Sequence, residues 1–299
     1  MAEPEQLRGM FTFPPQLAGE PSTRNWYSEL LNHPDCQGNS ARIQEAYEHF
    51  RSSSLARSSA SCLPAEENGT AAAGTKQQSA QYIKPDLALN RYLKLQKEAG
   101  DNGTRHREIE ELSKQDANCL AIWARPDTQT LDLLVETQNR LSELVGPAEY
   151  NAKKATARLV KLMIMFDKVG VAVGFVPAED SYTHHHLRHQ LHTMALATGV
   201  SIDTCYTAPL AHVTIGRFID NAFFEAFDQG GATEEKRNRM ERWVNLVQQI
   251  NEGLQQVHWG DLSWVVGEDK GLEIQLGYIK FGRGTDQADL VGDTLKNRL

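Results

Sequence analysis

The chain has 299 residues, of which 40% are hydrophobic and 23% charged, and its formal net charge is −8 at pH 7. This length suits one large domain or two small ones, and the hydrophobic content supports a core. The acidic balance argues against an extended basic surface, so we expect no binding to duplex DNA. A small nucleotide or an RNA end, held in a local pocket, is compatible with this charge.

The sequence contains four scattered cysteines, Cys36, Cys62, Cys119 and Cys205, and no CxxC pair. This pattern predicts neither a zinc ribbon nor a disulfide framework. The first five residues lack the basic start and apolar run of a signal peptide, and no apolar stretch reaches the length of a membrane span. We therefore expect reduced thiols, no membrane partner, and a location in the cytoplasm or the nucleus.

The N-terminal part is predicted to be a helical extension. Short helices are expected near 25–31 and 40–51, and a further helix over 86–99. Residues 52–80 are rich in Ser, Ala, Gly and Glu and lack apolar periodicity, which is typical of a flexible linker. We divide this part into an N-terminal helical arm with an unknown protein partner (1–51), a linker (52–80) and a helical connector (81–116).

Residues 117–285 are predicted to form a folded domain, followed by a tail over 286–299. Its expected strands are 119–124, 158–166, 170–176, 209–218, 263–266 and 272–281. Its expected helices, several with an apolar stripe, are 128–145, 182–198 and 234–257. A hairpin is expected at Asp167–Gly170, and Gly199 should end the second helix. Strands and helices mix without strict alternation, which favours an α+β fold with largely antiparallel sheets.

The stretch 209–218 contains the most suggestive chemistry. On an ideal strand, His212 and Thr214 point to the same face. Imidazole can move a proton near neutral pH, and a hydroxyl can donate a hydrogen bond to a phosphate oxygen. About one His-x-Ser/Thr triplet is expected by chance in this chain, so a hydrogen-bonded pair at a sheet edge is the alternative. Arg217 has the opposite parity and would join this face only through a bulge or twist near Gly216, the alternative being an ion pair on the far face.

A second group of candidates lies on the helix predicted at 182–198. His185, His189 and His192 share one helical face and could approach a metal ion, but we favour a polar outer face instead. His184 and Arg188 lie between this face and the apolar one, where they could reach a ligand bound over the sheet. The sequence contains no Walker-type or GxGxxG loop and no GxSxG elbow, which disfavours ATP, dinucleotide and serine-hydrolase chemistry.

The order of these motifs resembles the two-histidine phosphoesterase superfamily, specifically the fungal RNA ligase and cyclic nucleotide phosphodiesterase-like proteins. The resemblance covers roughly 117–284 and is carried by Cys119–Pro126, Ala157–Lys161, Tyr182–Arg188, Ala211–Phe218 and Trp264–Glu268 with Gly271 and Leu272.

The resemblance implies a bilobal α+β fold with a cleft between two pseudo-symmetric halves, each with a strand bearing His-x-Thr or His-x-Ser. In the family's chemistry, one histidine activates water or a hydroxyl, the other protonates the leaving oxygen, and no metal or other cofactor is required. By resemblance, the catalytic residues are His212 and Thr214. A small cyclic nucleotide or RNA end is the expected partner, with Tyr182, His184, Arg188 and Arg217 as the substrate-binding residues.

The chain departs from the family pattern in its first half. The first His-x-Thr should lie between the helix ending at Val145 and the strand starting near Ala157, but residues 146–156 contain no histidine. With one half-site, hydrolysis of a cyclic phosphodiester is expected to be impaired, because losing one member of an acid/base pair removes orders of magnitude of rate. The N-terminal lobe would be incomplete, with an exposed strand edge.

Four explanations stay open at this stage. The chain is a pseudoenzyme that binds nucleotide or RNA without turnover, or a truncated or mis-spliced product of an active enzyme. Alternatively, a residue of the 184–192 helix replaces the missing base, or the chain is an interaction protein that acts through its N-terminal arm.

Overall fold

A computed structural model describes residues 25–63, 83–87, 89–90, 157–199, 208–220, 223–224, 232–267, 272, 275–276 and 293–294. These residues combine helices with antiparallel sheet, which confirms the predicted α+β class. The strand and helix predicted at 119–124 and 128–145 lie outside the described residues, as does the segment 146–156 where the first His-x-Thr was expected.

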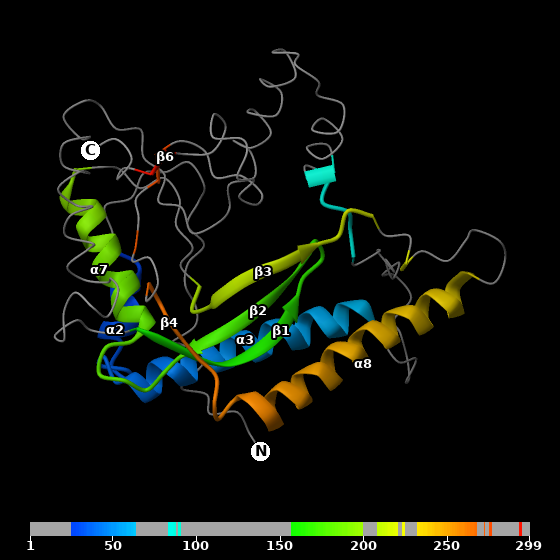
Figure 1. The fold of residues 1–299 in the computed structure, drawn as a ribbon, viewed down its shortest axis with the longest axis horizontal. Helices are drawn as coiled ribbons and strands as arrows, with labels where there is room; N and C mark the ends of the chain where they lie inside the picture. The colour runs from blue at the N-terminus through cyan, green and yellow to red at the C-terminus, as the bar shows by residue number, and fades with distance from the viewer. Residues whose placement is uncertain are drawn as a thin grey trace, which may run out of the picture.

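A curled four-stranded antiparallel sheet is the centre of the structure (Figure 1). Its strand order is β3-β2-β1-β4, so β1 and β2 are central and β3 and β4 lie at the margins. The strands are β1 (Arg158–Phe166), β2 (Gly170–Pro177), β3 (Ala211–Arg217) and β4 (Ser263–Val265). A separate two-stranded sheet pairs β5 (Gln275–Leu276) with β6 (Asp293–Thr294), so the expected C-terminal tail contains a strand.

The predicted hairpin between β1 and β2 is confirmed. Oδ1 of Asp167 accepts hydrogen bonds from the backbone N–H groups of Val169 and Gly170, both at 2.8 Å. An aspartate that bonds the backbone two residues on is the usual stabiliser of such a turn. The turn sets the register in which Phe166 lies opposite Val171.

Two irregularities in the ladders redirect side chains. In β1 the register shifts between Val160 and Met163, and Lys161 adopts the left-handed conformation with φ +52°. In β3, Thr214 lies opposite Ala172 while Gly216 lies opposite Val171, so Ile215 is the extra residue of a bulge. A bulge reverses the alternation of side chains beyond it.

The structure describes the helices α2 (Tyr27–Asn32), α3 (Ser40–Cys62), α7 (His184–Ala197) and α8 (Ala232–His258). The helices α3 and α8 contact each other and run along the sheet (Figure 1). Ile43, Ala46 and Tyr47 of α3 are fully buried in one core cluster with Leu159 and Val176 of the central strands. The N-terminal part of the chain thus supplies apolar cover to the central strands.

This packing corrects the predicted division of the N-terminal part. The helix expected to end at Arg51 continues to Cys62, through the first eleven residues of the predicted linker, and Ser58 and Cys62 are buried. The segment 25–63 is part of the core rather than a separate arm. Apolar periodicity did not reveal this extension because the residues that it buries are the small side chains Ser58 and Cys62.

The helices predicted near 25–31 and over 182–198 and 234–257 are confirmed to within two residues, while most of the helix predicted over 86–99 lies outside the described residues. Thr183 caps α7 by accepting from the backbone N–H groups of His185 and His186, and Gly199 follows its end with φ +77°. In α8, Met240 and Val247 are buried on the predicted apolar stripe. No described helix is long and apolar enough to cross a membrane.

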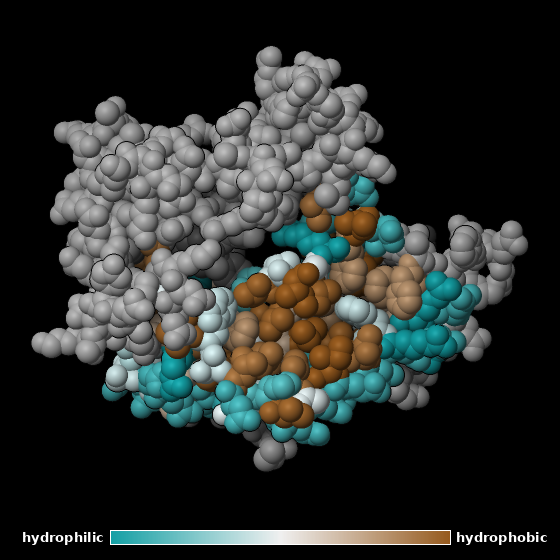
Figure 2. Space-filling view, viewed as in Figure 1, coloured by the Kyte–Doolittle hydropathy of each residue, from teal (hydrophilic) through white to brown (hydrophobic). Residues whose placement is uncertain are grey.

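The face of the sheet turned toward the viewer in Figure 2 is largely hydrophobic. Ile164, Val173 and Val213 lie in one row across β1, β2 and β3, and Val213 is 41% exposed. Ile215 and Trp264 are also exposed, at 57% and 44%.

Candidate functional site

The candidate site is built on β3. His212 lies opposite Gly174 and Thr214 opposite Ala172, and residues opposite each other in a sheet project from the same face. A Cβ at Gly174 would lie 3.2 Å from Cδ of Arg51 on α3, so this face is the one that α3 covers. His212 and Thr214 thus share a face, with His212 half-buried and Thr214 exposed beyond the part that α3 covers most closely.

The bulge at Ile215 brings Arg217 onto the same face. Arg217 lies opposite Gly170, and a Cβ at Gly170 would be 3.7 Å from Cγ of Arg217. Its guanidinium donates to Oδ2 of Asp86 at 2.7 Å, and the Asp86 side chain is only 8% exposed. Both sequence hypotheses therefore hold in part: a bulge redirects Arg217, and the residue forms an ion pair there.

The environment of His212 favours its neutral form. Partial burial lowers the pKa of His212 from its usual value of 6.5, and the positive charge of Arg188 lowers it further, while Asp167 opposes these effects. An imidazole that is neutral at pH 7 can accept a proton from a bound hydroxyl or water. Thr214 can donate to a phosphate oxygen on the same face.

Arg188 lies in a cage of tyrosines between α7, α2 and α3. Its guanidinium lies 4.3 Å from the ring centroid of Tyr27 and donates to the hydroxyls of Tyr27 and Tyr47 at 3.2 and 3.1 Å. It also donates to the carbonyl of Ala208 at 2.8 Å, three residues before β3 begins. Arg188 is 5% exposed, so it positions the start of β3 and sets the electrostatic field at His212.

The other two residues expected to bind substrate are His184, the first residue of α7, and Tyr182, which lies just before this helix. The hydroxyl of Tyr182 donates to Oε1 of Gln190 at 2.6 Å, and burial raises its pKa to about 12. The ring of His184 packs edge-on against Tyr47, and burial lowers its pKa to about 3. Both residues are neutral at pH 7, and the contacts described here join them to α7 and α3.

Two of the three histidines on the expected polar outer face of α7 are buried instead, while His189 is partly exposed. His185 and His192 are 0% and 1% exposed, because α2 and α3 pack over them with Tyr27 and Tyr47. His185 donates from Nε2 to the carbonyl of Tyr27, so its Nδ1 accepts from the hydroxyl of Tyr47, each at 2.9 Å. In the part of the chain that the structure describes, no group of three His, Cys, Asp or Glu side chains could hold a metal ion.

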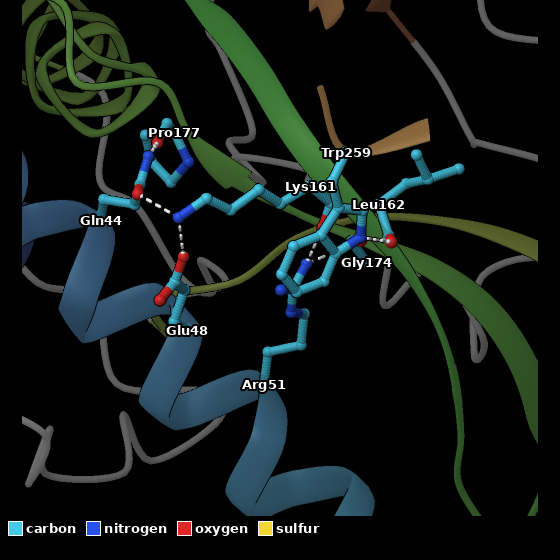
Figure 3. A network of polar contacts seen from close by, with 8 residues as sticks. All are labelled: Gln44, Glu48, Arg51, Lys161, Leu162, Gly174, Pro177 and Trp259. Carbon is cyan, nitrogen blue, oxygen red and sulfur yellow. Dashed lines mark hydrogen bonds and ion pairs between the residues drawn. The ribbon is translucent and has the colours of Figure 1, made fainter. Parts of the chain in front are cut away.

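A polar network at the Lys161 bulge holds α3 to the sheet (Figure 3). Lys161 donates from Nζ to Gln44 at 2.7 Å and to Glu48 at 2.5 Å, and Arg51 donates to the carbonyls of Lys161 and Gly174. The indole of Trp259 donates to the carbonyl of Leu162 at 2.8 Å. The bulge leaves carbonyls without ladder partners, and these side chains satisfy them.

Sequence reasoning missed the residues that support the site from the N-terminal part. Tyr27, Tyr47 and Asp86 contact Arg188 or Arg217 across sequence separations of 131 to 161 residues. No local spacing in the sequence relates such distant positions.

Comparison with models of protein families, with curated proteins and with solved structures finds no match to this chain.

Proposed function

We propose that the chain binds a small cyclic nucleotide or the cyclic phosphate of an RNA end at the His212–Thr214 face of β3. The proposal rests on one observation: a bulge at Ile215 gathers an imidazole, a hydroxyl and a guanidinium on one face of a marginal strand. These groups supply a base, a neutral donor and a positive charge, which are the elements that recognise a phosphodiester.

The site supports binding more directly than turnover. Hydrolysis of a cyclic phosphate needs a base for water and an acid for the leaving oxygen, on opposite sides of phosphorus. His212 has the lowered pKa of a base, and His184, which the sequence analysis placed within reach of a ligand over the sheet, is buried against Tyr47. We also propose that the chain has the bilobal fold that the resemblance implies.

Binding is tested by titrating 2′,3′-cyclic AMP into the full chain in a calorimeter. We expect His212→Ala and Thr214→Val each to weaken binding about tenfold or more, because each removes a hydrogen bond to a charged group. The matched control is His258→Ala, which removes an exposed histidine at the end of α8. Equal affinities for the wild type and His212→Ala would refute the proposal.

Hydrolysis of the same compound is measured beside binding. If the wild type hydrolyses the compound and His212→Ala does not, the chain is an active phosphodiesterase and must contain a second acid/base residue. Binding without turnover assigns a nucleotide-binding protein that uses a half-site.

A further inference from the structure

We propose that Asp86 determines which phosphate esters bind at the His212–Thr214 face. By balancing the charge of Arg217, Asp86 makes a phosphodiester with one negative charge a better ligand than a phosphomonoester with two. This inference rests on the proposed function and names the charge class of its ligand. The contact that carries it is the ion pair in which Oδ2 of Asp86 accepts from Arg217 at 2.7 Å.

Asp86 is held in place at the end of β3 by its backbone as well as its side chain. Its N–H donates to the carbonyl of Phe218, the residue that follows β3, at 2.7 Å. Its Oδ1 accepts from the N–H of Leu89 at 2.9 Å, and its Oδ2 accepts from Arg217. Both carboxylate oxygens are therefore engaged, and the negative charge has a fixed position beside the guanidinium.

This ion pair reduces the net charge of the face. Asp86 offsets the positive charge that Arg217 brings to the face on which His212 lies. His212 is itself neutral at pH 7, because burial and Arg188 lower its pKa. The other two charges that act on His212, those of Arg188 and Asp167, have opposite signs and oppose each other. The face therefore lacks the excess of positive charge that a doubly charged anion favours.

Burial makes the charge of Asp86 more effective than that of its charged neighbours. Salt screens a buried charge far less than an exposed one. The Asp86 side chain is only 8% exposed, whereas Asp167 and two lysines at the same end of the sheet, Lys84 and Lys168, are exposed. A ligand on the face should therefore interact more strongly with Asp86 than with these exposed groups.

A phosphate that contacts Arg217 from the His212–Thr214 side lies close to Asp86. A guanidinium presents several N–H groups in one plane, and each bonds an anionic oxygen at about 2.8 Å. Since Nη1 of Arg217 already donates to Asp86, the phosphate oxygens would lie within about 8 Å of the carboxylate. At this separation the two anions repel each other, and the repulsion grows in proportion to the charge of the phosphate.

The charge of the ester therefore decides how well it binds. A phosphodiester carries one negative charge at pH 7.5, whereas a phosphomonoester carries about −1.5 to −2. The doubly charged ester is attracted more strongly to Arg217, but Asp86 repels it in the same proportion. It also loses more hydration when it leaves water. Without the charge of Asp86, the attraction to Arg217 would favour the monoester instead.

The test measures the affinity of the full chain by calorimetry at pH 7.5 for 3′-AMP and for its methyl ester. Both compounds carry an open 3′-phosphate, and they differ in charge. We expect the wild type to bind the methyl ester about threefold more tightly than 3′-AMP, or better. In Asp86→Asn, affinity for the methyl ester should rise about two- to tenfold, and affinity for 3′-AMP by about the square of that factor.

Two results would overturn the inference. One is a wild type that binds 3′-AMP as tightly as the methyl ester or more tightly. The other is an equal gain for both compounds in Asp86→Asn, since a charge effect must be larger for the doubly charged ligand. If Asp86→Asn does not fold, the order of the two esters in the wild type decides.

Asp180→Asn is the matched control. Asp180 also forms an ion pair with an arginine, Arg158, through two bonds of 2.8 Å. The neighbour of Arg158, Leu159, lies opposite the last residue of β2, whereas Arg217 lies opposite the first. Loss of the same charge at this distant end should change both affinities by less than about twofold. A control that shifts the preference as much as Asp86→Asn also overturns the inference.

2′,3′-Cyclic AMP separates this inference from the proposed function. If this compound binds and His212→Ala weakens its binding, while Asp86→Asn gives equal gains for the two open esters, the role of Asp86 is overturned and the proposed function stands. If neither the cyclic compound nor either open ester binds, the proposed function is refuted and this inference is overturned with it.

Discussion

The two margins of the central sheet differ in the side chains that they carry. Along β1, the amide of Asn251 and the indole of Trp259 bond the backbone of Ile164 and Leu162 that β4 leaves unpaired. Along β3, the chain presents two exposed apolar residues and the His212–Thr214 pair. One margin is closed by side chains that stabilise the fold, and the other carries the candidate chemistry.

The difference shows how stability and function are divided in this chain. At the β1 margin, the polar groups of Asn251 and Trp259 are bonded to the backbone of the sheet. The β3 margin depends for its position on Arg188, which bonds the carbonyl of Ala208 from within the buried cluster of α7. Perturbing each margin should therefore have separable effects on stability and binding.

The largest expected effect is loss of stability in acid. Burial lowers the pKa of His184 to about 3 and that of His185 well below 6.5. Below pH 6.5 the unfolded chain binds protons that the folded chain excludes, so the free energy of unfolding falls as the pH falls and is insensitive to these groups above pH 7.5. Two histidines should together remove about 4 kcal/mol between pH 7.5 and pH 5, measured by urea denaturation.

Hydrogen exchange can locate this acid effect. Because Arg188 anchors β3 from within the histidine cluster, amides of 211–217 should lose protection at a higher pH than the amide of Ile164. Asn251, which holds Ile164, does not change charge in this range. Loss of protection at the same pH on both margins would contradict the separate support of β3.

A matched pair of glycines provides the next test. A Cβ at Gly174 would lie 2.5 Å from the sulfur of Met165, whereas no described atom lies within 4 Å of a Cβ at Gly216. Gly174→Val should cost about 3 kcal/mol through overpacking at the centre of the sheet. Gly216→Val on β3 should change the free energy of unfolding by less than about 0.5 kcal/mol. Equal costs would show that the β3 margin is as tightly packed as the centre.

A smaller loss is expected when the closed margin is opened. Asn251→Leu keeps the size of the side chain but leaves the N–H and carbonyl of Ile164 without their partner. The expected cost is about 2 kcal/mol, the penalty for unsatisfied, partly buried backbone groups. Gln248→Leu, on the exposed face of the same helix, is the control. Binding of 2′,3′-cyclic AMP should not change in either variant.

The sequence predicted the regular elements of the sheet domain well. The strand over 158–166 matches β1, and the hairpin, α7 and α8 begin and end within two residues of expectation. These segments have strong local signals: runs of apolar residues, an aspartate in the turn, and a wide apolar stripe. The strand bearing His212 was also found, because its alternation is local.

Long-range features of the site could not be predicted in the same way. The burial of His185 depends on Tyr27 and Tyr47, which are more than 130 residues away in the sequence. The local pattern of histidines therefore predicts a solvent-exposed helical face. The continuation of α3 past Arg51 depends on packing against distant residues, since Leu55 and Cys62 join the core cluster that contains Phe166. The sequence predicts that Arg217 joins the face of His212 only if β3 contains a bulge, and it does not reveal where a ladder shifts register.

A further small loss of stability is expected to accompany a gain in binding. Asp86 holds the guanidinium of Arg217 through Oδ2 and caps the N–H of Leu89 through Oδ1. Asp86→Asn retains the capping oxygen but removes the negative charge that faces Arg217. The guanidinium should therefore interact more strongly with a phosphate on its own face of β3. The fold should lose about 1 kcal/mol, because Asp86 is buried but the Arg217 side chain is 24% exposed, so that solvent screens the pair. Affinity for 2′,3′-cyclic AMP should rise two- to tenfold, with the gain abolished in Asp86→Asn combined with Arg217→Gln. Unchanged affinity in the single variant would mean that Arg217 serves the fold alone, and that the ligand depends on His212 and Thr214.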